Sequence, residues 1–240
     1  MKLLFIRHAE PDYEHDSITE KGIKEAELLT KRLLQEKPNA VYLSPMGRAQ
    51  KTAEEYLDKT NIKAETIPWL HEFIVDITFP DGHKQIPWDL LPAFVENNPD
   101  LYDLNKWYNV PIMKTGDVYS EYQKVSQGID SLLEKHGYMR DGMFYKAFNS
   151  NDDTIMFFCH FGVECVLLSH LLNISPVLLW QGFCAAPSSV TTVYTEERKK
   201  GIVQFRVSSF GDISHLYSGN EKPSFAARFC ETYDNKDERH

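Results

Sequence analysis

The chain has 240 residues, which is enough for one large domain or for one domain with a substantial insertion. Apolar residues make up 42% and charged residues 25%, ordinary values for a globular protein in water. The formal net charge of -9 argues against general binding to nucleic acid or to an anionic membrane face. The sequence holds no run of about 18 apolar residues that would span a bilayer. We therefore expect neither a nucleic-acid nor a membrane partner.

The cysteines form no C-x-x-C pair and no zinc-ribbon spacing. The apolar run at the start of the chain is too short for a signal peptide. We therefore predict a cytoplasmic protein whose cysteines are reduced thiols. They are Cys159, Cys165, Cys184 and Cys230.

The first predicted element is a short apolar strand at residues 2–6, which ends abruptly in charge at Arg7 and His8. Such a run is typical of a buried parallel strand whose carboxyl end is functional. A helix is expected from Thr19, whose side chain would cap it. The apolar face of this helix is predicted to be Ile23, Ala26, Leu29 and Leu33.

A second strand is predicted at residues 40–44, and Pro45 separates it from a helix over residues 47–59. Two strand-then-helix units in succession predict an α/β fold. We expect a three-layer sandwich with a mostly parallel central sheet flanked by helices.

Residues 73–116 differ in character, because they are rich in Pro, Trp and Tyr. We interpret them as a largely helical insertion over the active site, within a single domain that covers residues 1–240. The aromatic side chains of the insertion would either roof the site or form a satellite core.

The second half of the chain is predicted to begin with a helix over residues 117–136, followed by a hairpin turn at Asp141 and Gly142. The strongest buried-strand pattern, Thr154–Cys159, ends at His160. Two helices, two final strands and an irregular tail from Glu221 are expected to follow.

Two predicted core strands therefore end in a histidine, His8 and His160. In open α/β sheets the carboxyl ends of the strands form the ligand crevice. A histidine there stands on a rigid strand with an open tip. The alternative is that each histidine only caps its strand by hydrogen bonding, but two of them with an adjacent arginine favour chemistry.

Several segments resemble the histidine phosphatase superfamily, also called the phosphoglycerate mutase-like family. RHAE at residues 7–10 resembles its R-H-G-E signature, and ITEKGIKEAELL at 18–29 resembles its first helix start. YLSPMGRAQKTAE at 42–54 is similar to its S-S-P-L-x-R-A-x-Q-T-A block, and WLHEF at 69–73 to its acid segment. FFCHFGVECVLL at 157–168 resembles the strand and helix of the second histidine. The segments follow the family's order and cover about two thirds of the chain.

The resemblance implies a role for each matching residue. His8 would be the nucleophile that forms a phosphohistidine. Arg7 and Arg48 would clamp the phosphoryl oxygens with their guanidinium groups. His160 would donate a further hydrogen bond, and the backbone N–H of Phe161 would add another at a helix start. The family chemistry needs no metal and no cofactor.

Glu72 is the candidate general acid, which would protonate the leaving oxygen and then activate water. The sequence after it departs from the family's W-E-G continuation, so Asp76 and Asp12 remain alternatives. Glu10, the fourth residue of the first motif, is expected to have a structural role. Glu14 stands where many relatives carry a phosphate-contacting asparagine, so it would point away from the phosphate or contact a cationic part of the substrate.

Two further departures are Ala9 in place of the motif glycine and Phe161 in place of a glycine, which would narrow the pocket mouth. The leading interpretation is a phosphatase acting on a small phosphorylated substrate, with a homodimer as a possible assembly. The alternatives are a phosphosugar mutase, although the extra basic residues of true mutases are missing, and a phosphate-binding regulatory module with weak turnover. A metal hydrolase built on His8, Glu10 and His160 is disfavoured, because the arginines would repel a cation.

Overall fold

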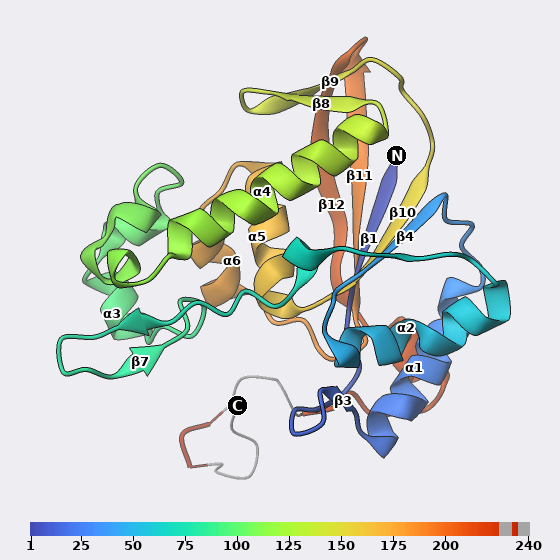
Figure 1. The fold of residues 1–240 in the computed structure, drawn as a ribbon, viewed down its shortest axis with the longest axis horizontal. Coiled ribbons are helices and arrows are strands. Elements are labelled where there is room, and N and C mark those ends of the chain that lie inside the picture. The colour runs from blue at the N-terminus through green and yellow to red at the C-terminus, as the bar shows by residue number, and fades with distance from the viewer. Residues whose placement is uncertain (226–231, 235–240) are drawn as a thin grey trace.

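The computed structural model describes residues 1–225 and 232–234. Its centre is an eight-stranded sheet with the order β5-β4-β10-β1-β11-β12-β9-β8 (Figure 1). The strands of this sheet are β1 (Lys2–Arg7), β4 (Ala40–Leu43), β5 (Glu65–Thr66), β8 (Tyr138–Asp141), β9 (Phe144–Ala147), β10 (Thr154–Cys159), β11 (Val190–Lys199) and β12 (Ile202–Asp212).

The half of the sheet that carries both histidines is parallel. β1 pairs with β10, β10 with β4 and β4 with β5, all in parallel, whereas β11, β12, β9 and β8 add antiparallel pairings. Arg7 is the register partner of Cys159, so β1 and β10 end at the same level. His8 and His160 therefore leave the sheet side by side.

Helices cover both faces of the sheet, which confirms the predicted three-layer α/β sandwich. Successive residues of a strand point to opposite faces. Leu3 and Phe5 of β1 pack into the core on one face, and Leu4 and Ile6 pack into the core on the other. The first face is covered by α4 (Val118–Lys135), α5 (Phe161–Leu172) and α6 (Pro176–Gly182), and the second by α1 (Glu20–Leu33) and α2 (Gly47–Thr60).

Helix α1 begins as predicted, because the Thr19 side chain accepts a hydrogen bond from the backbone N–H of Gly22. Ala26, Leu29 and Leu33 are buried, but Ile23 is 45% exposed, so the predicted apolar face was wrong at this residue. Gly22 is buried instead, and a side chain there would meet the backbone of Glu10. The buried side of α1 is therefore centred on Gly22, Ala26 and Leu29, and Ile23 lies at its edge.

The insertion begins with a small hairpin that the sequence did not predict, and short helical turns follow. Trp107 of the insertion is fully buried and meets Trp180 of α6 edge to face, with ring centroids 6.0 Å apart. This contact belongs to a satellite core, whereas Trp88 reaches the active site, so both roles expected for the aromatics occur. The elements are β6 (Ile77–Thr78), β7 (Lys84–Gln85), α3 (Pro92–Glu96), and the 3-10 helices η2 (Pro99–Tyr102), η3 (Trp107–Asn109) and η4 (Pro111–Thr115).

The hairpin of β8 and β9 lies one residue later than predicted. Asp141 is the last paired residue of β8 and faces Phe144, so the two-residue turn is Gly142 and Met143. Gly142 has a φ of 63°, a left-handed conformation that glycine adopts without strain. The remaining short elements are β2 (Pro11–Asp12), β3 (Ser17–Ile18), η1 (Pro68–Leu70) and α7 (Ser214–Ser218).

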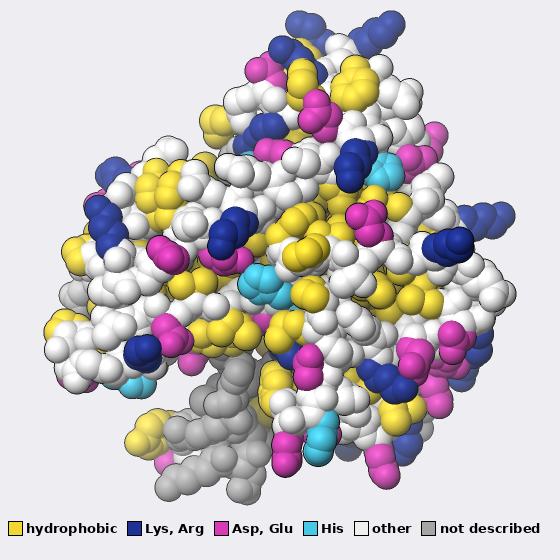
Figure 2. Space-filling view, viewed as in Figure 1, with side chains coloured by type: hydrophobic (Ala, Val, Ile, Leu, Met, Phe, Trp, Pro, Cys, Tyr) yellow, Lys and Arg dark blue, Asp and Glu magenta, His cyan; other side chains and the backbone are white. Residues whose placement is uncertain are grey.

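Acidic and basic side chains are interspersed across the face shown in Figure 2, with hydrophobic side chains between them. Within residues 1–225 and 232–234, each helix is too short or too polar to cross a membrane. Cys159 and Cys165 are buried free thiols and Cys184 is an exposed free thiol, whereas Cys230 lies outside the described residues.

Candidate active site

The two predicted histidines meet at the carboxyl edge of the sheet. The backbone N–H of His8 donates to the carbonyl of Cys159 at 3.0 Å, which ties the end of β1 to the end of β10. The two imidazole rings are tilted by 54°, with centroids 5.1 Å apart. Both side chains are almost fully buried. The pocket is therefore built on rigid strand ends, as the sequence predicts.

His8 is held in one orientation and kept neutral. Its Nδ1 lies 2.8 Å from the carbonyl oxygen of Ala9. An Nδ1–H that donates to this carbonyl leaves the lone pair on Nε2. Burial lowers the pKa of His8 well below its ordinary value, and the charges of Arg7 and Arg48 lower it further. Nε2 is thus unprotonated at neutral pH, as a nucleophile must be.

His160 is paired with Ser44, a site residue that sequence reasoning missed. The hydroxyl of Ser44, at the end of β4, lies 2.7 Å from Nε2 of His160 and accepts from the backbone N–H of Met46 at 3.2 Å. A hydroxyl that accepts from Met46 can donate to Nε2, and Nδ1 then carries the proton. That Nδ1 is buried without a hydrogen-bond partner among residues 1–225 and 232–234. Burial, followed by the nearby His8, lowers the pKa of His160 well below its ordinary value, so the ring is neutral and can donate one hydrogen bond.

Arg7 points into the pocket from the last position of β1. Its Nη1 donates to the carbonyl of Ala185, and its guanidinium lies 5.7 Å from the centre of the Phe161 ring. Phe161 in turn meets Trp88 of the insertion edge to face. The side chain of Phe161, which replaces the family's glycine, therefore supports the guanidinium. Phe161 is also the first residue of α5, so its N–H belongs to a turn whose N–H groups have no partner within the helix.

Arg48 is anchored by Asp16, a second residue that the sequence did not single out. Nη1 of Arg48 donates to Oδ1 of Asp16 at 2.7 Å, and the other carboxylate oxygen accepts from the N–H of Gly47 at 2.6 Å. Asp16 has a φ of 45°, and a Cβ at position 47 would lie 2.2 Å from its carbonyl oxygen. A glycine at position 47 is therefore needed for the loop to approach α2. Nη2 of Arg48 lies 3.4 Å from Sδ of Met46.

Glu72 lies beside this pocket, and the alternative acids do not. Oε1 of Glu72 accepts from the N–H groups of Phe73 at 2.7 Å and Val163 at 3.0 Å. Val163 is in the first turn of α5, where the helix dipole favours a carboxylate. The N–H of Glu72 also lies 3.4 Å from Sδ of Met46, the atom that contacts Arg48.

Three other carboxylates are more exposed than Glu72. Asp76 is exposed and pairs with Lys84 at 3.5 Å. Asp12 lies 2.8 Å from Nδ1 of His15, on the loop between β2 and β3. Glu14 is exposed on the same loop. Of the candidate acids, Glu72 alone combines burial with contacts to the elements that carry Arg48 and His160.

Gly162 sets the distance between α5 and Glu72. A Cβ at this position would lie 2.6 Å from Oε1 of Glu72 and 2.8 Å from Nε1 of Trp88. We expect Gly162→Ala to displace the carboxyl group and to lower kcat about 100-fold, the usual cost of a displacement near 1 Å at a reacting group. Gly182→Ala, at the end of α6 with open space around the new methyl group, is the control and should leave kcat unchanged. Equal activity of the two variants would show that the position of Glu72 does not matter.

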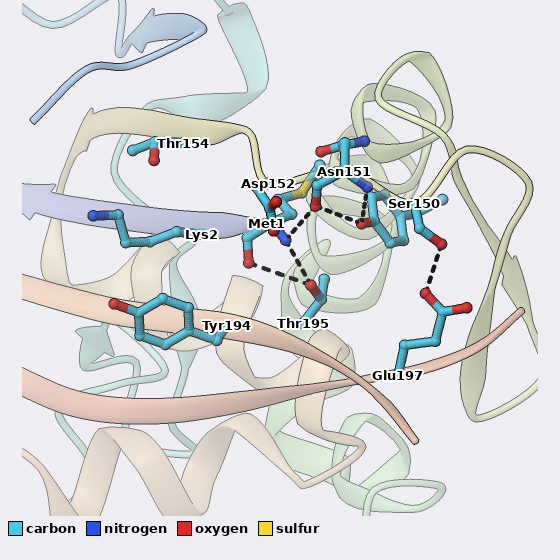
Figure 3. Close-up of a pocket in the computed structure, with 10 residues that line it drawn as sticks. Met1, Lys2, Ser150, Asn151, Asp152, Thr154, Tyr194, Thr195 and Glu197 are labelled. Carbon is cyan, nitrogen blue, oxygen red and sulfur yellow. Dashed lines mark hydrogen bonds between the residues drawn. The ribbon is translucent and has the colours of Figure 1, made fainter. Parts of the chain in front are cut away.

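Within residues 1–225 and 232–234, no cluster of three His, Cys, Asp or Glu side chains is placed to hold a metal ion. A separate cavity of about 580 Å³ lies at the opposite end of β1, where the amino group of Met1 donates to the carbonyl of Asn151 and to Oγ1 of Thr195 (Figure 3). None of the predicted site residues lines it.

Comparison with known proteins agrees with this architecture. Residues 3–86 match the histidine phosphatase superfamily, branch 1. Phosphoserine phosphatase 1 of Hydrogenobacter thermophilus is 22% identical over 221 residues, which are 87% of this chain and 93% of that protein.

Solved structures of phosphatases share the fold. A variant of phosphoserine phosphatase from Entamoeba histolytica, in complex with phosphoserine, has a TM-score of 0.60 at 19% identity and covers 90% of this chain and 98% of its own. The mycobacterial glucosyl-3-phosphoglycerate phosphatase has a TM-score of 0.59 at 16% identity, over 88% and 98% of the two chains. The matched segment and these likenesses bear out the resemblance to the histidine phosphatase superfamily, in the fold and in the segment that carries Arg7, His8 and Arg48.

Proposed function

We propose that the protein is a phosphatase that hydrolyses a small phosphomonoester through a phosphohistidine on His8. The observation that carries this proposal is the state of His8: a buried, neutral imidazole whose Nδ1 is tied to a backbone carbonyl and whose Nε2 lone pair is available. Relatives named as phosphatases of phosphoserine and of a phosphoglycerate derivative support the class of substrate.

In the first step, Nε2 of His8 attacks phosphorus in line with the leaving oxygen, so the N–P bond forms as the P–O bond to the alcohol breaks. Arg7 and Arg48 bind the phosphoryl oxygens and stabilise their charge in the transition state. The free N–H of His160 adds a neutral donor. Glu72, when protonated, gives its proton to the leaving oxygen.

In the second step, the carboxylate of Glu72 removes a proton from a water molecule that attacks the phosphohistidine. The N–P bond breaks, inorganic phosphate leaves, and His8 and Glu72 return to their starting states. All groups in this cycle belong to the chain, so no metal or cofactor is needed. A mutase would instead return the phosphoryl group to a second position of the substrate.

The metal-free mechanism makes a direct prediction. With p-nitrophenyl phosphate as the substrate, we expect the rate to be unchanged after incubation with EDTA and dialysis. Phosphate released is measured together with p-nitrophenol, because a mutase or a binding module would not release the two in equal amounts over many turnovers. Loss of activity on chelation, with recovery on addition of a divalent cation, would favour the metal hydrolase instead.

Three expectations from the sequence stay predictions beside this proposal. They are the single domain over residues 1–240, the cytoplasmic location and the homodimer. None of the three alters the proposed chemistry at His8.

A further inference from the structure

A buried carboxyl group that the reaction does not use lies behind the phosphate pocket. Glu164 is in the first turn of α5, four residues after His160, and its side chain is 1% exposed. The side chain of Thr191 on β11 hydrogen-bonds to it. Its Oε1 is buried with no hydrogen-bond partner among the residues that the structure describes. A buried carboxyl oxygen without a partner is costly, especially in the ionised form.

The charged and titratable groups that interact with Glu164 lie on β1, β10, α5 and the segment after η1. Arg7 on β1 is the cation, and Glu72 is the other carboxylate. Cys159 on β10 and Cys165 on α5 are buried thiols, and the charge of Glu164 helps to raise the pKa of each beyond the larger effect of burial. Both thiols are thus neutral. The hydrogen bond from Thr191 and, after it, the charge of Arg7 favour the ionised form of Glu164, whereas Glu72 disfavours it.

Arg7 also has a buried polar atom that lacks a hydrogen bond within the described residues. Its Nε is buried without a hydrogen-bond partner in the described part of the chain, although its Nη1 is bonded to the carbonyl of Ala185. The ring of Phe161, three residues before Glu164 on α5, lies 5.7 Å from the guanidinium of Arg7, and Thr191 lies on β11, which pairs with β1. Arg7 and Glu164 therefore belong to one buried cluster, in which the charge of Arg7 acts on Glu164.

The ionisation of Glu164 is balanced near neutral pH. Burial raises the pKa of its carboxyl group to about 7, while the hydrogen bond from Thr191 and the charge of Arg7 oppose this rise. A dianion bound in front of Arg7 would offset the charge of the guanidinium and would repel an ionised Glu164. Binding of the dianion must therefore favour the protonated form of Glu164.

We propose that Glu164 is a positioning residue for Arg7 that takes up a proton when a tetrahedral dianion binds in the pocket. This rests on the proposed function, because it requires the dianion to bind at Arg7. In its protonated state Glu164 leaves the full charge of Arg7 to the ligand. In its ionised state it competes with the ligand for that charge.

The affinity of the pocket for a dianion is therefore expected to depend on pH. Below about pH 7 Glu164 is protonated before and after binding, so the affinity for a dianion is constant. Above that pH the free protein must take up a proton in order to bind, so the affinity falls as the pH rises. Inorganic sulfate is a suitable probe, because it remains a dianion across this range, whereas phosphate itself titrates.

The test is calorimetric titration with sodium sulfate between pH 5.5 and 8.5 at constant ionic strength. For the unmodified protein we expect the affinity to fall about 5- to 10-fold from pH 6 to pH 8. For Glu164→Gln, a neutral residue of the same size, we expect the affinity at pH 6 to be retained and to change less than about twofold by pH 8. Glu25→Gln is the matched control, because Glu25 is also buried with its pKa raised by burial to about 7, but it binds the N–H of Glu10 outside the phosphate pocket. This control should keep the pH dependence of the unmodified protein.

The outcomes separate the two proposals. If the affinity of Glu164→Gln for sulfate falls with pH as in the unmodified protein, the role of Glu164 is overturned. The same holds if Glu25→Gln loses the pH dependence. Either result leaves the proposed phosphatase activity intact. Sulfate affinity that is unaffected by Arg7→Ala and Arg48→Ala would contradict the phosphate pocket itself. If Glu164→Gln fails to fold, proton uptake by the unmodified protein decides: titration at pH 7 in buffers of different ionisation enthalpy should show net uptake, and zero uptake would overturn the inference.

Discussion

His8→Ala is expected to lower kcat for p-nitrophenyl phosphate by at least about a thousandfold, because it removes the atom to which the phosphoryl group is transferred. The substitution also leaves a space among Arg7, Arg48 and His160, all of which keep their own partners. Binding of phosphate or of sulfate should therefore survive. A variant that binds but does not turn over would identify His8 as the nucleophile and not as a structural residue.

The control for this experiment is His83→Ala, an exposed histidine in the loop between β6 and β7. It should keep the rate of the unmodified protein. The intermediate can be sought directly by quenching the reaction at high pH, where phosphohistidine persists, and by mass analysis of the peptide that contains residue 8. Retention of more than about 1% of the rate by His8→Ala would mean that the covalent mechanism is wrong.

The main features of the fold could be predicted because the two histidine strands are continuous apolar runs. Buried on both faces, β1 and β10 have few polar residues before their ends, so the change to charge at Arg7 and to His160 marks where each strand leaves the sheet. The error at Ile23 has a different cause. A periodic pattern reports which side of a helix is apolar, but it does not show that the buried side is centred on Gly22, against which the chain near Glu10 packs.

The site residues that sequence reasoning missed all act through loop or packing geometry. Asp16 reaches Arg48 only because its left-handed backbone turns the loop toward α2, and nothing in the local sequence marks that turn. Ser44 was a weaker omission, since it is the last residue of the strand predicted at residues 40–44, which pairs with β10 in the structure. The burial of Glu164 could not be foreseen, because a single glutamate in an apolar helix is equally compatible with an exposed face.

Glu72→Gln is the variant that assigns the general acid, because its effect should depend on the leaving group. Glutamine keeps an oxygen that can accept from the N–H groups of Phe73 and Val163, so the side chain can stay in place. It cannot donate the proton that an alkoxide leaving group requires. For phosphoserine or another alkyl phosphate we expect kcat to fall about 10² to 10⁴-fold. For p-nitrophenyl phosphate, whose phenolate leaves without a proton, the first step should change little.

The same substitution should slow the second step for every substrate, since water then lacks its base. With p-nitrophenyl phosphate, Glu72→Gln should therefore release a burst of p-nitrophenol close to one equivalent of enzyme, followed by slow turnover, and the phosphohistidine should accumulate. Asp76→Asn and Asp12→Asn are the controls, since these carboxylates lie with Lys84 and His15. An equal loss for alkyl and p-nitrophenyl phosphates without a burst would mean that Glu72 only holds α5 in position. A leaving-group-dependent loss in Asp76→Asn would move the acid to that residue, so the comparison assigns the proton donor in either case.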